Sequence, residues 1–351
     1  MSSKIIQLER NKQIDSLRAF SFTLVFLYHS KFLEAGYIGV DLFFLLSGYL
    51  MTLSINQILE REGIFGIFTF FNKRIARLIP SILVLVCSIF FFSYLIIPDF
   101  DRGEILRTGL STLIMLTNYY IAITQDYFGV SAIFNPFTHM WSIAAEIHFY
   151  IIIGFLGFIF KFRATGWFLI CFILILSLFI FKGDSAQTYL FTHTRVFSFF
   201  IGSILFFLKK NLRLKFKNSL IVILLLYLLI ALSSTIKLPN IFIGMGWLTN
   251  SIVANVFGFV LLILITDYNS ETKTYTASNK FYSFWIYIGR ISYSLYLFHY
   301  PIISFSFWLW GDLSFFPVCI IFLISIGIAG VNFKYVESKY YSQLYLKSKN
   351  T

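Results

Sequence analysis

Residues 38–58 read IGVDLFFLLSGYLMTLSINQI, an apolar run that contains a single charged side chain. A helix that crosses a membrane needs about 20 mostly apolar residues, and this run is long enough. Comparable runs lie at 14–32, 79–97, 105–123, 139–160, 166–182, 190–208, 218–236, 246–266, 284–304 and 313–333. Of the 351 residues, 58% are hydrophobic and only 13% are charged, whereas soluble domains have about 25% charged residues. The sequence therefore predicts an all-α polytopic membrane protein and excludes a water-soluble domain.

The basic residues indicate how many of these runs cross the membrane. The net charge is +12, and membrane proteins concentrate Lys and Arg on the cytoplasmic side, so the excess does not require a nucleic-acid partner. If 105–123 crossed, the basic stretch KKNLRLKFK at 209–217 would lie outside, against this rule. We therefore expect ten transmembrane helices with both termini cytoplasmic, and an interfacial or re-entrant helix at 105–123. Little chain is left over, so we expect one integral membrane domain over 1–351 without a fused soluble domain.

Ionisable residues inside the predicted spans are candidates for function, because their burial in lipid is costly. Arg18 and His29 are eleven positions apart in the first span. That spacing is almost three helical turns, so they share one face about 16 Å apart, with His29 toward the outer half. Asp41 lies near the outer end of the next span, where it either orients the imidazole of His29 or caps its own helix. Considered without His29, Arg18 could equally well extend its side chain to the lipid headgroups of the inner leaflet.

Two arginines follow on the cytoplasmic side, in NKRIARLIP at 72–80. Arg74 and Arg77 are three apart, so they project from one face of a helix. Such a pair suits the bidentate binding of phosphate groups. Arginines at a membrane edge are more often topology determinants or lipid contacts, and both interpretations stay open at this point.

The span that begins PFTHMWSIAAEIHFY contains a carboxylate, Glu146. A carboxylate at that depth has to be neutral or matched with a cation. His139 and His148 flank it on nearly opposite faces of a helix, and no HExxH pattern occurs, so we expect no metal site. Farther along, Arg195 begins the sixth span, and Tyr293 and His299 lie in the ninth, within IGRISYSLYLFHYP.

In this order, these segments resemble acyltransferase family 3, integral membrane enzymes that O-acylate, mostly O-acetylate, bacterial surface carbohydrates. The similarity extends from about residue 10 to residue 340. The matching motifs are Arg18 and His29 with ten positions between them, GVDLFFLLSG at 39–48, KRIARLIP at 73–80, WSIAAEIHFY at 141–150, GRISYSLYLFH at 289–299, and Val336 with Glu337. His148 departs from the pattern, because many members have glutamine there.

The resemblance implies an acyl-CoA donor, usually acetyl-CoA, on the cytoplasmic side, with no permanently bound cofactor. The implied acceptor is a carbohydrate hydroxyl of an O-antigen, capsule, exopolysaccharide or lipid-linked repeat unit, and the implied location is the bacterial inner or plasma membrane. The acyl group would pass through the helix bundle. The expected roles are catalysis by His29, Glu146 and Asp41, donor binding by Arg18, Arg74 and Arg77, and acceptor binding by Arg195, Tyr293 and His299. His29 would act as a general base or as a transient acyl carrier.

Two other functions stay open at this stage. A transporter or flippase for a lipid-linked sugar would use the same buried charges as a substrate path, and it would not need acyl-CoA. A non-catalytic membrane sensor or assembly partner fits the buried ionisable residues least well. The O-acetyl content of surface polysaccharide, in cells with and without the gene, discriminates the transferase from the flippase.

Overall fold

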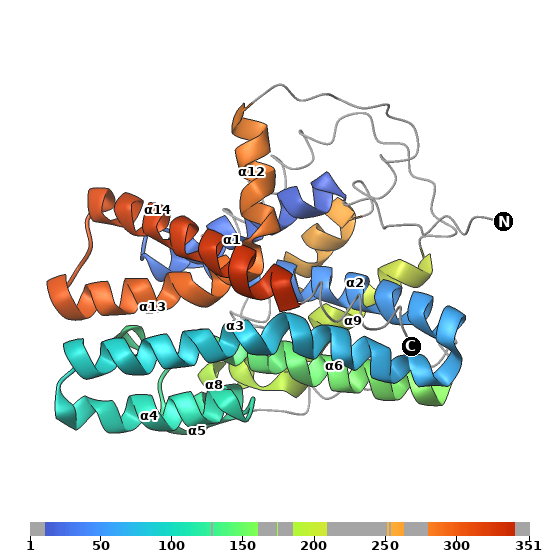
Figure 1. Ribbon diagram of the computed structural model, residues 1–351, viewed down its shortest axis with the longest axis horizontal. Coiled ribbons are helices and arrows are strands. Elements are labelled where there is room, and N and C mark those ends of the chain that lie inside the picture. Colours follow the sequence, from blue (N-terminus) through green and yellow to red (C-terminus); the bar gives the residue numbers. More distant parts are fainter. Residues whose placement is uncertain are drawn as a thin grey trace, which may run out of the picture.

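The computed structural model describes residues 11–127, 129–160, 174, 185–208, 251–252, 254–262 and 280–340. Every regular element in these ranges is helical (Figure 1), which confirms the all-α prediction. Among the described residues, three stretches are long and apolar enough to cross a membrane: Glu34–Ile96, Met140–Ile159 and Phe315–Tyr340. The predicted spans 166–182 and 218–236 lie almost entirely outside the described residues. The count of ten spans and the cytoplasmic termini therefore stay predictions.

The first helix, α1 (Lys12–His29), begins and ends at clear local signals. The side-chain oxygen of Asn11 accepts hydrogen bonds from the backbone N–H groups of Gln13 and Ile14, at 2.9 and 3.3 Å, as an N-cap does. After the helix, Lys31 takes a left-handed φ of 64°, and a 3₁₀ turn, η1 (Glu34–Tyr37), leads into α2 (Ile38–Glu62). His29 is thus the last residue of α1, at the end where the chain turns back.

The segment between α3 (Gly66–Ile96) and α6 (Met140–Phe160) enters the bundle and returns. α4 (Asp99–Leu113) packs on α3, Met115 turns the chain with a φ of 59°, and α5 (Thr117–Thr124) packs on α4. Gln125, just after α5, donates to Glu104 near the start of α4, at 2.8 Å. The start of α4 and the end of α5 therefore lie side by side in this α4–α5 hairpin. The helix expected at 105–123 is two short helices instead of one, because the turn at Met115 interrupts it.

The remaining elements are η2 (Gly63–Phe65), η3 (Val130–Phe134), α8 (Ser185–Leu190), α9 (Thr192–Leu208), α12 (Lys280–Arg290), α13 (Ser292–Trp310), α14 (Phe315–Asn332) and the π-helical η5 (Phe333–Glu337). The single span expected at 284–304 is broken at Ile291, and α12 stands at a steep angle to α13 (Figure 1). Gly289 explains the break. A Cβ there would lie 1.7 Å from the carbonyl oxygen of Asp15, so α12 packs closely on α1, whereas α13 packs on α3 and α14.

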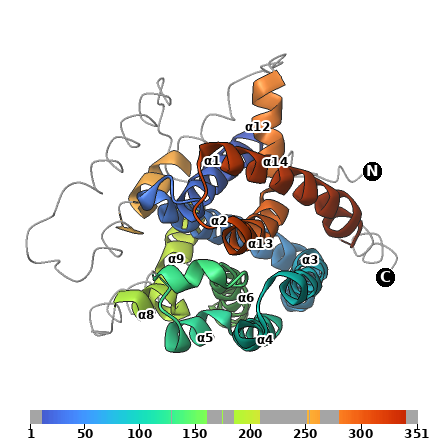
Figure 2. The ribbon, with the colours of Figure 1, turned by 90° about the vertical axis from the view of Figure 1, so that its left-hand side faces the viewer.

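α2 lies near the middle of the bundle, with α1, α3, α6 and α9 around it (Figure 2). Its contact with α9 is close enough to require glycine on both helices. A Cβ at Gly48 would lie 1.9 Å from the carbonyl oxygen of Phe199, and one at Gly202 would lie 2.0 Å from that of Leu45. Small residues allow helices to approach in this way. This close packing fixes the relative depth of the polar side chains that α2 and α9 carry.

Candidate active site

His29 at the end of α1 is hydrogen-bonded to His299 of α13, with 2.9 Å between His29 Nδ1 and His299 Nε2. The protons in this pair follow from the other neighbours of His299. Its Nδ1 lies 3.0 Å from the carbonyl oxygen of Leu295 and 2.9 Å from that of Tyr296, and carbonyl oxygens only accept. His299 Nδ1 therefore carries a proton, and its Nε2 accepts the Nδ1–H of His29. The Nε2 of His29 keeps its lone pair, which makes this nitrogen a base.

A third histidine completes a buried group, which we call the histidine cluster: His29, His139 and His299. His139 donates from Nε2 to the carbonyl oxygen of Leu297 at 3.0 Å, and its ring centroid lies 5.8 Å from that of His299. The ring of Tyr300 lies 4.6 Å from His29 and 5.0 Å from His139. Within the described part of the chain, no three His, Cys, Asp or Glu side chains are placed to hold a metal ion. The geometry of the cluster suits proton transfer.

Beside the cluster lies a cavity of about 70 Å³, bordered by α1, α2, α3, α6 and α13. Its polar lining includes two arginines, so we call it the arginine cavity; these residues are Arg18, Ser47, Arg77, Ser142, Glu146, Tyr150, Ser292, Tyr293 and Tyr296. Glu146 accepts hydrogen bonds from the Ser47 hydroxyl, at 2.7 Å, and from the Tyr150 hydroxyl. Arg18 and Arg77 line the same cavity as this carboxylate.

The arginine cavity and the histidine cluster share a wall. Tyr296 and Ser142 both line the cavity, and their hydroxyl oxygens are 2.6 Å apart. On its other side, the Tyr296 ring lies 5.5 Å from the His299 ring and 5.7 Å from the His139 ring. A group bound in the cavity is therefore one aromatic side chain away from the histidine cluster.

The two arginines of α3 have different surroundings, although they project from the same face. Arg77 lines the cavity, with its Nε 3.5 Å from a carboxylate oxygen of Glu337 in η5 and its guanidinium 5.9 Å from the Tyr293 ring. Arg74 donates to the Ser54 hydroxyl at 3.0 Å and does not line the cavity. Of this pair, only Arg77 is placed at the cavity wall, and Glu337 positions it.

Asp41 is paired with Arg195, not with His29. The carboxylate accepts from the Arg195 guanidinium at 2.8 Å, with both side chains fully buried, and from the hydroxyls of Ser198 and Ser251 at 3.1 and 3.0 Å. The expectation that Asp41 orients His29 is wrong, as is the alternative that it caps α2, since that helix has no side-chain cap bond. The close packing of α2 on α9 brings Arg195 to Asp41, and a buried carboxylate requires such a cation. The position beside His29 that was expected for Asp41 is occupied by His299.

A family model described as an acyltransferase domain, Acyl_transf_3, matches residues 11–333 of this chain. That range contains the histidine cluster, the arginine cavity and Arg195. The chain belongs to the Acyl_transf_3 family. This membership confirms the resemblance that the motifs indicated.

Similar proteins of this acyltransferase family carry a more specific name. They include O-acetyltransferase OatA of Staphylococcus aureus strain NCTC 8325 / PS 47 and the protein of the same name from strain MRSA252, each 30% identical to this chain over 353 residues. The similarity covers 93% of this chain and 56% of each relative, so the chain spans about half the length of the curated relatives it matches. No solved structure matches the chain.

Four side chains of the acyltransferase domain were missed by the sequence reasoning: Ser47, Ser142, Tyr296 and Tyr300. All lie within or directly beside the motifs that carry the family resemblance. A usable signal was present in the spacing of Tyr296, His299 and Tyr300, since positions i, i+3 and i+4 lie on one face of a helix. The two serines gave no such signal, because serine is common at close helix contacts in membranes.

Proposed function

We propose that this protein transfers an acetyl group from acetyl-CoA on the cytoplasmic side to a hydroxyl of a cell-surface or lipid-linked carbohydrate. The observation that carries the proposal is the pairing of His29 with His299, which leaves one basic ring nitrogen in a cluster that Tyr296 separates from a cavity lined by two arginines. Membership in the acyltransferase family and similarity to proteins named O-acetyltransferase support the reaction type.

The arginine cavity suits the acyl end of the donor. Its volume of about 70 Å³ has room for several water molecules or for a small acyl group. The coenzyme phosphates would stay at the entrance, within reach of Arg74 and Arg77, and Arg18 would extend the positive charge inward. Glu146 would balance the arginines when the donor is absent and assist proton movement at the donor end.

In the transfer step, Nε2 of His29 takes the proton of the acceptor hydroxyl, and the hydroxyl oxygen attacks the acetyl carbonyl carbon. A C–O ester bond forms and the C–S thioester bond breaks. CoA leaves as a thiolate, which takes the proton back from His29 and becomes a thiol. His299 stabilises the charge on His29 by accepting its Nδ1–H. If His29 instead carries the acetyl group, the same nitrogen attacks the thioester first, and trapping an acetylated enzyme separates the two routes.

The test is the O-acetyl content of surface carbohydrate from cells that express the wild type, His29→Ala or His148→Ala, measured as acetate released by mild alkali. His148 is the matched control, because its Nδ1 is hydrogen-bonded to the Thr192 hydroxyl at 2.7 Å, outside the histidine cluster. We expect His29→Ala to reduce the O-acetyl transfer activity at least about 100-fold, with the same amount of protein in the membrane. His148→Ala should retain the wild-type activity. Full activity of His29→Ala would remove this histidine from the mechanism. Movement of sugar across the membrane without acyl-CoA, and without released acetate, would support the flippase instead.

A further inference from the structure

A second cavity, of about 420 Å³, lies between the α4–α5 hairpin, the η3 segment and the last turns of α13. We call it the α4–α5 cavity. Its volume is within the range of about 300–1,000 Å³ that is usual for sites that bind small molecules. The cavity lies at the same end of the bundle as His29, because Lys31, just after α1, is ion-paired at 2.9 Å with Asp312, just after α13. No step of the mechanism above uses it.

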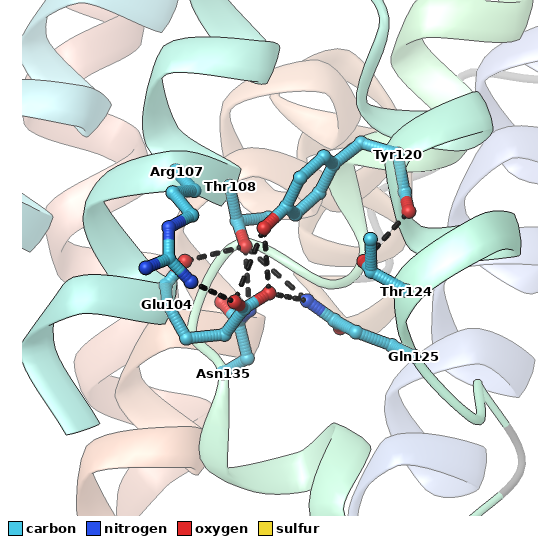
Figure 3. Close-up of polar contacts among 7 residues, drawn as sticks. All are labelled: Glu104, Arg107, Thr108, Tyr120, Thr124, Gln125 and Asn135. Carbon is cyan, nitrogen blue, oxygen red and sulfur yellow. Dashed lines mark hydrogen bonds and ion pairs between the residues drawn. The ribbon is translucent and has the colours of Figure 1, made fainter.

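One wall of this cavity is a network of hydrogen bonds that fixes its polar side chains (Figure 3). Glu104 accepts from the Gln125 side-chain N–H at 2.8 Å and from the Tyr120 hydroxyl at 3.0 Å. The Thr108 hydroxyl accepts from Gln125 at 3.3 Å and from Asn135 at 2.9 Å. Both N–H groups of Gln125 are thereby used, and its amide oxygen accepts nothing from the residues that the structure describes. The wall is therefore a preformed set of hydrogen-bond acceptors.

Two aromatic side chains form an apolar part of the lining. The indole N–H of Trp308 donates to the carbonyl oxygen of Phe134 at 2.8 Å, and the two rings lie 5.1 Å apart in an edge-to-face arrangement. Both rings are thus held in place. A pyranose ring has apolar C–H faces and a rim of hydroxyl groups, so it can contact an aromatic surface and fixed acceptors at the same time. The cavity offers both.

The charge of the lining limits which sugars the α4–α5 cavity can bind. Three lining side chains are carboxylates, those of Asp101, Glu104 and Asp126, and none of the lining residues that the structure describes is basic. Arg107 lies 3.5 Å from Glu104 but is mostly exposed and is not part of the lining. Like charges placed together at a binding site disfavour association. The cavity should therefore exclude sugars that carry carboxylate or phosphate groups and accept uncharged or amino-bearing ones.

The η3 segment connects this cavity to the histidine cluster. Ser131 and Phe134 of η3 line the cavity, while the carbonyl oxygen of Ala132 accepts from the Tyr300 hydroxyl at 2.9 Å. The Tyr300 ring in turn lies 4.6 Å from that of His29. The cavity is thus separated from His29 by one turn of η3 and one tyrosine. An adjoining unit of the same oligosaccharide can bridge a separation of that kind.

We propose that the α4–α5 cavity is a subsite for the carbohydrate acceptor. It holds one hexose or hexosamine unit without negative charge and thereby places a hydroxyl of the adjoining unit at Nε2 of His29. This inference rests on the proposed acetyl transfer and adds to it the class of acceptor and the place where the acceptor is held. Asp101, Gln125 and Trp308 are then specificity residues, not catalytic ones.

The experiment uses the purified full chain in lipid nanodiscs, with acetyl-CoA as donor and surface carbohydrate stripped of its esters by mild alkali as acceptor. We expect Asp101→Asn and Gln125→Ala to raise the KM for the carbohydrate about tenfold. The KM for acetyl-CoA and the slow hydrolysis of acetyl-CoA without acceptor should stay unchanged. Asp312→Asn is the matched control, because this carboxylate pairs with Lys31 outside the cavity lining and its loss should change neither KM.

Two further measurements address the ligand directly. A neutral trimer of N-acetylglucosamine and an amino-bearing trimer of glucosamine should compete with the acceptor, whereas an anionic trimer of galacturonate should not. Sugar-dependent tryptophan fluorescence should disappear in Trp308→Phe, a variant that keeps an aromatic ring. If the wild type transfers no acetyl group to the stripped carbohydrate, the proposed function is wrong. If it does transfer, but the two cavity variants keep the wild-type acceptor KM or galacturonate competes equally well, the subsite is wrong and the function stands.

Discussion

At the scale of single residues, the site depends on one proton shared between two imidazoles. His299 is held by two backbone carbonyl oxygens of its own helix, so its tautomer is set by α13 and does not depend on substrate. That tautomer makes His299 an acceptor toward His29 and directs the free lone pair of His29 to Nε2. In well-characterised catalytic histidines, a fixed acceptor at Nδ1 selects the tautomer in the same way.

Replacement of His299 tests this positioning role. In His299→Phe, the Nδ1–H of His29 loses its acceptor, and we expect kcat to fall about 100-fold with little change in the KM for acetyl-CoA. In His299→Gln, the side-chain oxygen can accept the same proton, so kcat should recover about tenfold relative to the Phe variant. Steady-state kinetics on the two purified proteins give the comparison. Equal kcat values for the Phe and Gln variants would mean that His299 only fills space.

The buried pair of Asp41 and Arg195 is expected to stabilise the bundle. Removal of one partner leaves an unpaired buried charge, a change that costs about 3–5 kcal/mol in other proteins. We expect Asp41→Leu and Arg195→Met each to lower the melting temperature in detergent, and the double variant to lie closer to the wild type than either single one. Thermal unfolding followed by intrinsic fluorescence measures all four proteins. Additive losses in the double variant would contradict the coupling.

The sequence predicted how deep an ionisable side chain lies along its helix, but it could not predict which side chain of another helix it contacts at that depth. Arg18 and Glu146 were expected in the bundle and Arg77 on its cytoplasmic side, and the structure brings all three to one cavity. Asp41 was placed at the depth of His29, yet its partner is Arg195 on α9. That pairing depends on the approach of α2 to α9 at Gly48 and Gly202. Hydropathy and residue spacing within one helix contain no information about this approach.

At the scale of elements, the apolar runs located helices better than they located breaks. The runs at 105–123 and 284–304 are each two helices, divided at Met115 and Ile291. Neither position has the glycine or proline that usually marks an interruption. Met115 takes a positive φ that its residue type does not suggest, and the break at Ile291 follows from the contact of Gly289 with α1. The break at Ile291 is therefore a consequence of tertiary packing.

The contact between α2 and α9 should tolerate no side chain at its glycines. We expect Gly48→Ala to cost more than about 1–3 kcal/mol of stability, because its Cβ would meet backbone, which cannot rotate away. Gly327→Ala on α14 is the matched control, since a Cβ at Gly327 has no atom within 4 Å. The melting temperatures of the two purified variants give the answer. A Gly48→Ala protein as stable as Gly327→Ala would contradict the close approach.

The α4–α5 hairpin is expected to have both of its ends on the outer side of the membrane. Gly103 in α4 and Thr124 at the end of α5 are exposed and lie at the same end of the bundle. In a protein whose natural cysteines are replaced by serine, Gly103→Cys and Thr124→Cys should both react with a membrane-impermeant maleimide added outside intact cells. Arg61→Cys, in the last turn of α2 and therefore on the expected cytoplasmic side, should not react. Labelling of only one hairpin position would indicate that the segment crosses the membrane after all.

At the scale of the whole molecule, the histidine cluster lies between the arginine cavity and the α4–α5 cavity. The arginine cavity adjoins the cluster through Tyr296, and the α4–α5 cavity adjoins it through Tyr300 and η3. The charged residues that line the first are two arginines and Glu146, whereas those that line the second are three carboxylates. Such a division fits an anionic donor and a carbohydrate acceptor that reach one base from opposite sides, so that only the acetyl group passes through the protein.

Passage of the acetyl group through the bundle can be measured in sealed proteoliposomes with acetyl-labelled acetyl-CoA inside and stripped surface carbohydrate outside. We expect labelled ester on the external carbohydrate while CoA stays in the lumen, and no labelled ester with His29→Ala. Transfer that occurs only when donor and acceptor are on the same side of the membrane would contradict the passage of the acetyl group through the bundle.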